Sequence, residues 1–364
     1  MPENLLIIAE AGVNHNGSLG RALEMVDVAA AAGADVIKFQ TFSADKLARK
    51  DAQLAEYQKT SADDTRSQWD LLKGLELSHE DFLAIRDRCA EQSIAFLSTG
   101  FDLDELRFLI DELSIPMVKI ASGDLTFAPM LVDAGRSGLP VILSTGMANL
   151  DEVERALQFL AVGYGIHTGA LDAATVATEA ARSRAWHDES IRAQMASLVT
   201  VLHCTTQYPA PLSILNVRAM LTIAEAFGLA VGYSDHSLGD LASTAAVTLG
   251  ATVIEKHFTL DKSLDGPDHA ASLDPGELVD FIARLRSIDV LLGTPVKQCQ
   301  PEEVSNRLAV RRSLVAARAL TAGEVIGELD LYCSRPGAGR TSFDFWDVVG
   351  TVANRDYADG EYLD

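Results

Sequence analysis

The chain has 364 residues, of which 48% are hydrophobic, and its formal net charge at neutral pH is −22. This acidic balance excludes the basic face that a nucleic-acid-binding protein needs, and no apolar run approaches the roughly 18 residues of a membrane span. The N-terminus lacks the basic segment of a signal peptide, and four scattered cysteines without a CxxC pair predict free thiols and a cytoplasmic location.

Eight short, nearly continuous apolar runs follow one another along the chain, as expected for parallel strands that are buried on both faces. They are Asn4–Gly12, Ala34–Gln40, Ser93–Gly100, Pro116–Asp124, Pro140–Gly146, Leu198–Cys204, Ala230–His236 and Thr252–Phe258. Helical patterns lie between them. Eight strand–helix units predict an α/β protein with a (β/α)8 TIM barrel. The alternative is a doubly wound open sheet, but no GxGxxG follows the first run.

Two connections are longer than a barrel needs. Residues 41–77 follow the second strand, so we expect them on the catalytic face as a lid or as a wall of the acceptor pocket. The helix after the fifth strand is predicted over Asn149–Val162, and an insertion at about 163–196 follows it on the opposite face. Its alanine-rich, charged content predicts helices with a structural or contact role.

The barrel pattern stops near residue 292, which sets the expected catalytic domain at 1–292. Residues 293–308 are polar, contain two prolines and read as a linker. Short β-like runs then follow over 309–364. They predict a small, separately folded, β-rich domain.

Polar side chains end nearly all of the eight runs, where the catalytic residues of such barrels lie. Lys38 and Lys119 stand within strands, where a lysine is costly unless it is paired or faces a ligand. With Ser122 and Ser144 nearby, they predict a pocket for a phosphate and a carboxylate. The alternative is that the lysines pair only with carboxylates and bind no ligand; the available partners are Glu10, Asp124 and Glu255.

His236 and His257 end the seventh and eighth runs, so their imidazoles are expected to converge at the barrel mouth. Two imidazoles with water and a substrate oxygen suit a divalent transition metal, and Glu10 is a possible carboxylate neighbour. His203 is a third candidate that falls earlier in its run. After the last strand, "DGPDHAAS" is predicted to present Asp268 and His269 over the mouth.

Several motifs, met in order, resemble the sialic acid synthase family. They are "IIAEAGVNHNGS", "ADVIKFQTF", "KIASGD", "ILSTGMA", "LHCTTQYPAP", "GYSDHSLG" and "IEKHFTLDKSLDGPDHAASLDP". The resemblance continues through "RRSLVAARALTAGEVI" and "RPGAG", which are similar to the family's C-terminal antifreeze-like SAF domain. Within the family the chain looks most similar to bacterial N-acetylneuraminate and N,N′-diacetyllegionaminate synthases.

The resemblance implies a transferase that condenses phosphoenolpyruvate with an N-acylated hexosamine and water. The acceptor would be N-acetylmannosamine or a 2,4-diacetamido-6-deoxy analogue. The products would be a nine-carbon 2-keto sugar acid and phosphate. The family implies a divalent metal, Mn²⁺ or Mg²⁺, held by His236 and His257.

The resemblance also implies a role for each residue that matches the family's motifs. The catalytic group would be Glu10, Lys119, His236 and His257. Phosphoenolpyruvate would contact Lys38, Lys119, Ser122, Ser144 and Ser234. The sugar would contact Gln40, Asp124, Thr206, Tyr208, Asp268 and Arg335. The family implies that Arg335 comes from the partner subunit of a domain-swapped homodimer.

Departures from the family pattern leave the acceptor open. Asp124 stands where a glutamate is usual, Thr206 where some members have asparagine, and Gly100 where proline is common. The same chemistry on a pseudaminic acid precursor or on a sugar phosphate is therefore an alternative. A metal-dependent hydrolase barrel and a non-catalytic carbohydrate-binding protein are alternatives of another class.

Overall fold

The computed structural model describes residues 5–53 and 67–364. The chain divides into two compact units, Met1–Gly293 and Thr294–Asp364, and each is described by itself. None of the helices within the described ranges is long and apolar enough to cross a membrane.

The first unit is built on eight parallel strands, which confirms the predicted barrel. The strands are β1 (Leu6–Gly12), β2 (Val36–Thr41), β3 (Ala95–Gly100), β4 (Val118–Ile120), β5 (Val141–Ser144), β6 (Val199–Cys204), β7 (Ala230–Asp235) and β8 (Val253–His257). Their hydrogen-bonded order is β3-β2-β1-β8-β7-β6-β5-β4. The two end strands, β3 and β4, are in contact and nearly close the barrel.

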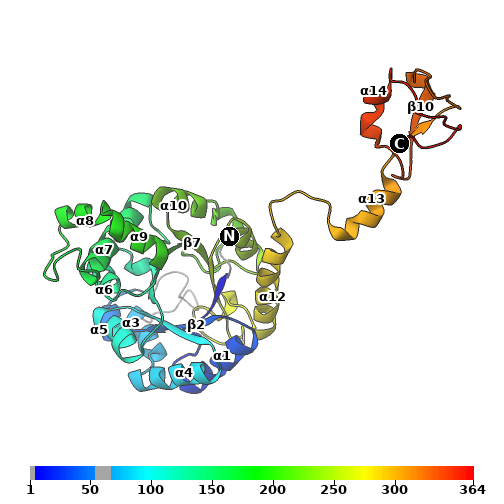
Figure 1. Ribbon diagram of the computed structural model, residues 1–364. Helices are drawn as coiled ribbons and strands as arrows, with labels where there is room; N and C mark the ends of the chain where they lie inside the picture. The colour runs from blue at the N-terminus through cyan, green and yellow to red at the C-terminus, as the bar shows by residue number, and fades with distance from the viewer. Residues whose placement is uncertain (1–4, 54–66) are drawn as a thin grey trace. The chain divides into compact units, whose positions relative to one another are not determined.

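Helices surround the strands on the outside of the barrel (Figure 1). They are α1 (Leu19–Ala31), α4 (His79–Glu91), α5 (Leu103–Arg107), α6 (Ala128–Arg136), α7 (Leu150–His167), α8 (Glu179–Trp186), α9 (Glu189–Leu198), α10 (Ala219–Phe227), α11 (Leu241–Thr248) and α12 (Pro275–Leu292). Two short helices of the long connection after β2, α2 (Ala44–Leu47) and α3 (Gln68–Leu75), lie instead at the carboxyl ends of the strands. Capping boxes begin several of them. Ser78 and Asp81 form the one at α4, and Asp274 and Glu277 form the one at α12.

The barrel interior is layered, because alternate residues of each strand point inward. One inward layer is apolar and forms a solid plug. Its members are Ile8, Val36, Leu97, Ile142, Leu202 and Val253. Two residues further along the same strands, the inward layer becomes polar. That second layer contains Glu10, Lys38, Thr99, Ser144, Cys204 and Glu255, which line a cavity. The apolar plug therefore supports a polar floor at the carboxyl ends of the strands.

Two predicted boundaries were wrong. The run Pro116–Asp124 is a strand only over Val118–Ile120, because a 3-10 turn at Ser122–Asp124 takes the chain out of the sheet. Helix α7 continues to His167, so it occupies the beginning of the region assigned to the insertion. After a non-helical stretch over 168–178, the region contains helices as predicted, and α8 and α9 pack against α7.

The second unit is small and β-rich. It contains α13 (Val304–Val310), β9 (Ser313–Ala316), β10 (Leu331–Ser334) and α14 (Phe345–Val348). β9 and β10 form an antiparallel pair. Buried side chains from both strands and from later segments make its own core, which includes Leu314, Leu331, Val348 and Tyr357. The stretch expected to be a linker, 293–308, contains a 3-10 turn at Pro301–Glu303 and the first turn of α13.

Candidate active site

A cavity of about 430 Å³ opens at the carboxyl ends of the barrel strands. Eleven of the fourteen residues predicted for the site line it: Glu10, Lys38, Gln40, Lys119, Ser122, Ser144, Thr206, Tyr208, Ser234, His236 and His257. The long connection after β2 contributes Leu47, Gln68 and Leu72 to the wall. The lid prediction also covers 54–66, which lie outside the described residues.

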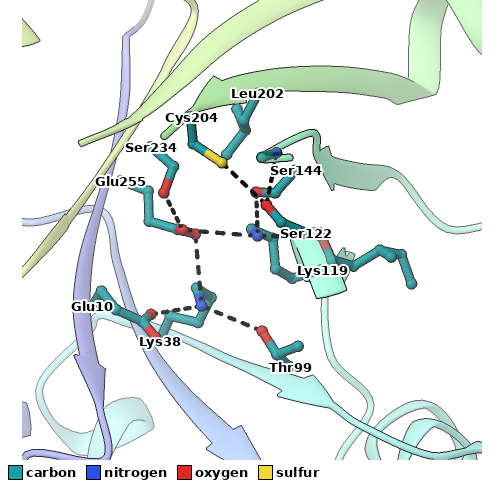
Figure 2. A network of polar contacts seen from close by, with 12 residues as sticks. Glu10, Lys38, Thr99, Lys119, Ser122, Ser144, Leu202, Cys204, Ser234 and Glu255 are labelled. Atoms are coloured by element: carbon teal, nitrogen blue, oxygen red, sulfur yellow. Dashed lines mark hydrogen bonds and ion pairs between the residues drawn. The ribbon is translucent and has the colours of Figure 1, made fainter. Parts of the chain in front are cut away.

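Four buried charged side chains form the floor of the cavity (Figure 2). The Lys38 ammonium lies 2.7 Å from Oε2 of Glu10 and 3.6 Å from Oε2 of Glu255. The Lys119 ammonium lies 3.8 Å from Oε1 of Glu255 and donates a hydrogen bond of 2.7 Å to Oγ of Ser144. Glu255 thus stands between the two lysines and holds both toward the cavity.

The two carboxyl groups of the floor differ in their electrostatics. Burial raises the pKa of Glu10 to about 7, although Lys38 opposes this shift. Burial would also raise the pKa of Glu255, but Lys119 and Lys38 together outweigh it and lower the value to about 2. Burial lowers the pKa of Lys119, whereas the two carboxylates raise that of Lys38. Glu255 is therefore the permanent counter-charge of the floor.

Hydroxyl groups continue the floor toward β6. Oγ of Ser122 accepts a hydrogen bond of 2.9 Å from the Gly146 amide and lies 3.1 Å from Sγ of Cys204. A Cβ atom at Gly146 would come within 2.6 Å of Oγ1 of Thr206 and 2.9 Å of Ser122 Oγ. A side chain at this position would therefore collide with Thr206, Cys204 and Ser122.

The two predicted histidines face each other across neighbouring strands, with ring centroids 5.7 Å apart. Nδ1 of His236 donates to the Thr205 carbonyl at 2.8 Å, which leaves the lone pair on Nε2. Nε2 accepts from the Tyr208 hydroxyl at 3.1 Å. Nδ1 of His257 is buried and has no hydrogen-bond partner in the described parts of the chain. Burial lowers the pKa of both imidazoles, so both rings are neutral near pH 7.

These observations fit a divalent metal. A neutral imidazole whose other nitrogen is held by a backbone carbonyl is the usual form of a histidine ligand. His257 offers an otherwise unsatisfied nitrogen. Across the described residues, no group of three or more His, Cys, Asp or Glu side chains is arranged to hold a metal. The pair would therefore supply two ligands, and water or substrate would supply the others.

The remaining predicted residues lie outside the cavity lining. Asp268 places Oδ2 3.9 Å from Nδ1 of His257, and burial raises its pKa to about 6. Asp124 is half-buried in the turn after β4, where burial also raises its pKa to about 6. Arg335 is exposed and belongs to the second compact unit. His203, the third histidine candidate, hydrogen-bonds the Leu215 carbonyl and is absent from this cavity lining.

The loop that carries Asp268 is fixed by the first barrel loop. The Asn14 amide donates to the Phe258 carbonyl and to Oγ of Ser272, and Ser272 Oγ in turn donates to the Asp268 carbonyl. His269, predicted to lie over the mouth, is instead fully buried and bridges Thr259 and Asn16, at 2.7 and 3.1 Å. The first barrel loop (Asn14–Asn16) and the loop after β8 (Asp265–Ser272) therefore pack together and hold Asp268 beside His257.

Sequence reasoning named Glu255 only as a possible partner of the lysines and missed it as a site residue. Its signal was its position two residues before His257, which places both side chains on the inward face of β8. Thr99, which accepts a hydrogen bond from Lys38 at 3.3 Å, and Cys204 were also missed. A threonine or a lone cysteine at a strand end does not by itself indicate a catalytic site. Only the register of the barrel strands shows that these two side chains reach the floor.

Fold and cavity define a (β/α)8-barrel enzyme with two buried lysines on the cavity floor beside a pair of histidines. A model of the NeuB family matches residues 25–297, and a SAF domain model matches residues 311–364. The chain belongs to the NeuB family and ends in a SAF domain.

Two relatives named N,N′-diacetyllegionaminic acid synthase are 41% identical to the chain. The protein from Legionella pneumophila aligns over 98% of this chain and 92% of its own length. The protein from Campylobacter jejuni aligns over 98% of both. The crystal structure of N-acetylneuraminic acid synthetase from Leptospira borgpetersenii superposes with a TM-score of 0.66 at 30% identity, covering 84% of this chain and 90% of that one.

His15 in the first barrel loop is buried in its neutral form. Nδ1 accepts a hydrogen bond of 3.1 Å from the Gly17 amide, so the ring proton is on Nε2, which has no partner among the described residues. Burial lowers the pKa of His15 from 6.5 to about 4. The unfolded chain therefore binds a proton between pH 6.5 and pH 4 that the folded protein does not. The stability due to neutral His15 is present above pH 6.5 and is lost as the pH falls toward 4.

We expect His15→Asn, which keeps an acceptor near the Gly17 amide, to reduce the acid sensitivity of folding. The wild-type protein should lose about 2 kcal/mol more unfolding free energy than the variant between pH 7 and pH 5. Urea denaturation at the two pH values measures this difference. His187→Asn, which replaces an exposed histidine after α8, is the control and should behave as wild type. Equal losses in His15→Asn and wild type would contradict the assignment.

Proposed function

We propose that the protein condenses phosphoenolpyruvate with an N-acylated hexosamine and water, giving a nine-carbon 2-keto sugar acid and phosphate. One observation carries this proposal. Two buried lysines and their serines form an anion floor that shares a single cavity with the His236–His257 pair. The 41% identity to two diacetyllegionaminic acid synthases supports the same chemistry.

The floor suits a small molecule with a phosphate and a carboxylate. We propose that the Lys38 and Lys119 ammonium groups bind these two anions, because both side chains line the cavity. Oγ of Ser122, Ser144 and Ser234 would complete the contacts. Ser234 now donates to Glu255 at 2.9 Å, and its hydroxyl lies 3.4 Å from His236. It therefore stands where the anion floor meets the histidine pair.

His236 and His257 would hold a divalent metal, Mn²⁺ or Mg²⁺, and the metal would supply Lewis-acid polarisation of the sugar aldehyde. The carbonyl of Thr205 orients the His236 ring for this task, and Tyr208 packs against it with ring centroids 4.1 Å apart. Tyr208 and Gln40 line the cavity and are proposed sugar contacts. Asp268, which faces His257, is a third.

The bonds made and broken follow from the two substrates. C3 of phosphoenolpyruvate forms a carbon–carbon bond to the sugar carbonyl carbon, whose oxygen becomes a hydroxyl. Water adds to C2, where positive charge develops. The resulting tetrahedral centre expels phosphate by cleavage of its C–O bond and becomes the ketone. We propose that Glu10 orients this water, because its carboxyl group lies at the floor beside Lys38.

The acceptor we propose is a 2,4-diacetamido-6-deoxy hexose, the type that fits the two relatives at 41% identity. The family resemblance implies that Thr206 stands where some members have asparagine, and Asp124 where a glutamate is usual. Thr206 lines the cavity, and its buried hydroxyl has no partner within the described chain, so it is open to the acceptor. The hydrolase alternative is not favoured, because the similar proteins are named synthases.

We further propose that the active enzyme is a domain-swapped homodimer in the cytoplasm, with Arg335 reaching the sugar of the partner subunit. Support comes from the division of the chain into two units joined by a polar stretch. The exposed guanidinium of Arg335, on the second unit, is also consistent with it.

A phosphate-release assay with phosphoenolpyruvate and three sugars tests the function. The sugars are N-acetylmannosamine, the 2,4-diacetamido-6-deoxy mannose analogue and the corresponding altrose analogue. We expect the highest kcat/KM with the diacetamido mannose analogue, and we expect a chelator to abolish turnover. Phosphate release that does not require any sugar would contradict the condensation. A clear preference for the altrose analogue would change only the acceptor.

Complementation tests the swapped role of Arg335. Homodimers of Lys119→Met should be inactive, and homodimers of Arg335→Ala should show a raised sugar KM with little change for phosphoenolpyruvate. Co-expression of the two variants in equal amounts should restore on the order of a quarter of the wild-type activity at limiting sugar, because each mixed dimer contains one intact site. If Arg335 served its own barrel, mixing would restore nothing.

A further inference from the structure

Side-chain contacts link strands β7 and β8 on both faces of the sheet, at two successive residue pairs. Their register pairs Ser234 with Glu255 and then Asp235 with Lys256. Because successive side chains alternate, Ser234 and Glu255 point into the cavity, whereas Asp235 and Lys256 point outward toward the helices. Neither of the two outward residues lines the cavity, and each is only 1% exposed. They form a buried ion pair behind the wall of the site.

The ion pair is completely enclosed by hydrogen bonds. The Lys256 ammonium lies 3.1 Å from Oδ2 of Asp235 and also donates to the Ser237 carbonyl. Oδ1 of Asp235 accepts from the amide and the hydroxyl of Ser237, at 2.9 and 2.6 Å. Oδ2 accepts from Ser243 of α11 at 2.7 Å. One carboxylate thus ties together β8, the turn after β7, and the helix that covers both.

Burying such a pair requires a reason other than stability. Two charges taken out of water are often no more stabilising than well-packed apolar residues of the same size, so a buried pair is better explained by structural specificity. The neighbouring outward residues of the same two strands are Tyr233 and Ile254, and both are fully buried. A charged pair directly beyond these two large buried side chains therefore marks a position where the geometry of the two strands is fixed.

The next residue in the chain after each of these two is a histidine of the pair. His236 follows Asp235, and His257 follows Lys256. The contact from Asp235 to the Ser237 amide spans His236 and fixes the backbone on either side of it. The Ala210 amide holds the His236 carbonyl at 2.9 Å. A sliding of β7 against β8 would change the separation of the two rings directly, and the ion pair opposes that sliding.

We propose that the Asp235–Lys256 ion pair is a positioning device that sets the separation and orientation of His236 and His257 from outside the barrel. It rests on the proposed metal centre. Asp235 and Lys256 touch no substrate; they act through the two histidines. The proposal explains why "GYSDHS" and "IEKHFT" carry an opposite charge immediately before each histidine. Partners that orient metal ligands typically change metal affinity by about 10- to 100-fold when they are replaced.

The test measures Mn²⁺ binding in the full-length protein, freed of metal, from the electron paramagnetic resonance signal of unbound Mn²⁺. The double variant Asp235→Asn/Lys256→Met removes both charges, retains an acceptor for the Ser237 amide and preserves volume. We expect its Kd for Mn²⁺ to rise about 10- to 100-fold. Its affinity for phosphoenolpyruvate without metal should remain that of wild type, because the lysine floor is intact.

A matched control is available on the other side of the barrel. Thr41 and Ser98 form a buried hydroxyl pair of 2.7 Å between β2 and β3, also on the outward face. Thr41→Val/Ser98→Ala should leave the Kd for Mn²⁺ unchanged. If the Asp235→Asn/Lys256→Met protein does not fold, Ser243→Ala decides the question, since it removes one hydrogen bond to Asp235 and should weaken Mn²⁺ binding about threefold.

The outcomes separate this proposal from the proposed function. Wild-type protein that binds no Mn²⁺, or His236→Ala protein that binds it as tightly as wild type, would overturn the metal centre and the positioning role together. Binding that depends on His236 but has the same Kd in the double variant, or in Ser243→Ala, would overturn the positioning role alone. An equal loss of affinity in the Thr41→Val/Ser98→Ala control would also overturn it.

Discussion

The site depends on the burial of two lysines in the closed interior of a barrel. An ammonium group is stable there only with a counter-charge, and Glu255 supplies it to both Lys38 and Lys119 while Glu10 pairs with Lys38. The apolar plug beneath this layer prevents the lysines from reaching water on the other side. Both lysines line the cavity, where a ligand with two anionic groups can reach them.

This arrangement reconciles an acidic protein with an anionic substrate. The chain carries a net charge of −22, yet its charged surface is far less effective than groups enclosed in a low-dielectric cavity, because solvent and salt screen exposed charges. Beside the floor, the buried rings of His236 and His257 are neutral and leave nitrogens available to a metal. One face of the cavity is therefore suited to anions and the adjoining face to a metal, so two different substrates can meet between them.

The sequence predicted the barrel and most of the cavity because strand ends leave a direct signal: an apolar run followed by polar residues. It failed where position depends on three-dimensional register. β4 was predicted too long, since nothing in "KIASGD" distinguishes a strand from the turn at Ser122–Asp124. Glu255 was undervalued because one carboxylate in a strand cannot reveal that it stands between two lysines. The role of Arg335 came only from the family resemblance, because a lone arginine in a turn has no chemical context.

The central claim is that the buried lysine floor binds phosphoenolpyruvate. The most direct test is calorimetric titration of phosphoenolpyruvate into the protein without sugar. Lys119→Met should fold, because Glu255 remains paired with Lys38. We expect it to lose at least about tenfold in affinity, since a charge-assisted contact to the ligand is removed. Lys297→Met, at an exposed lysine, should bind as wild type does. Wild-type affinity in Lys119→Met would contradict the account.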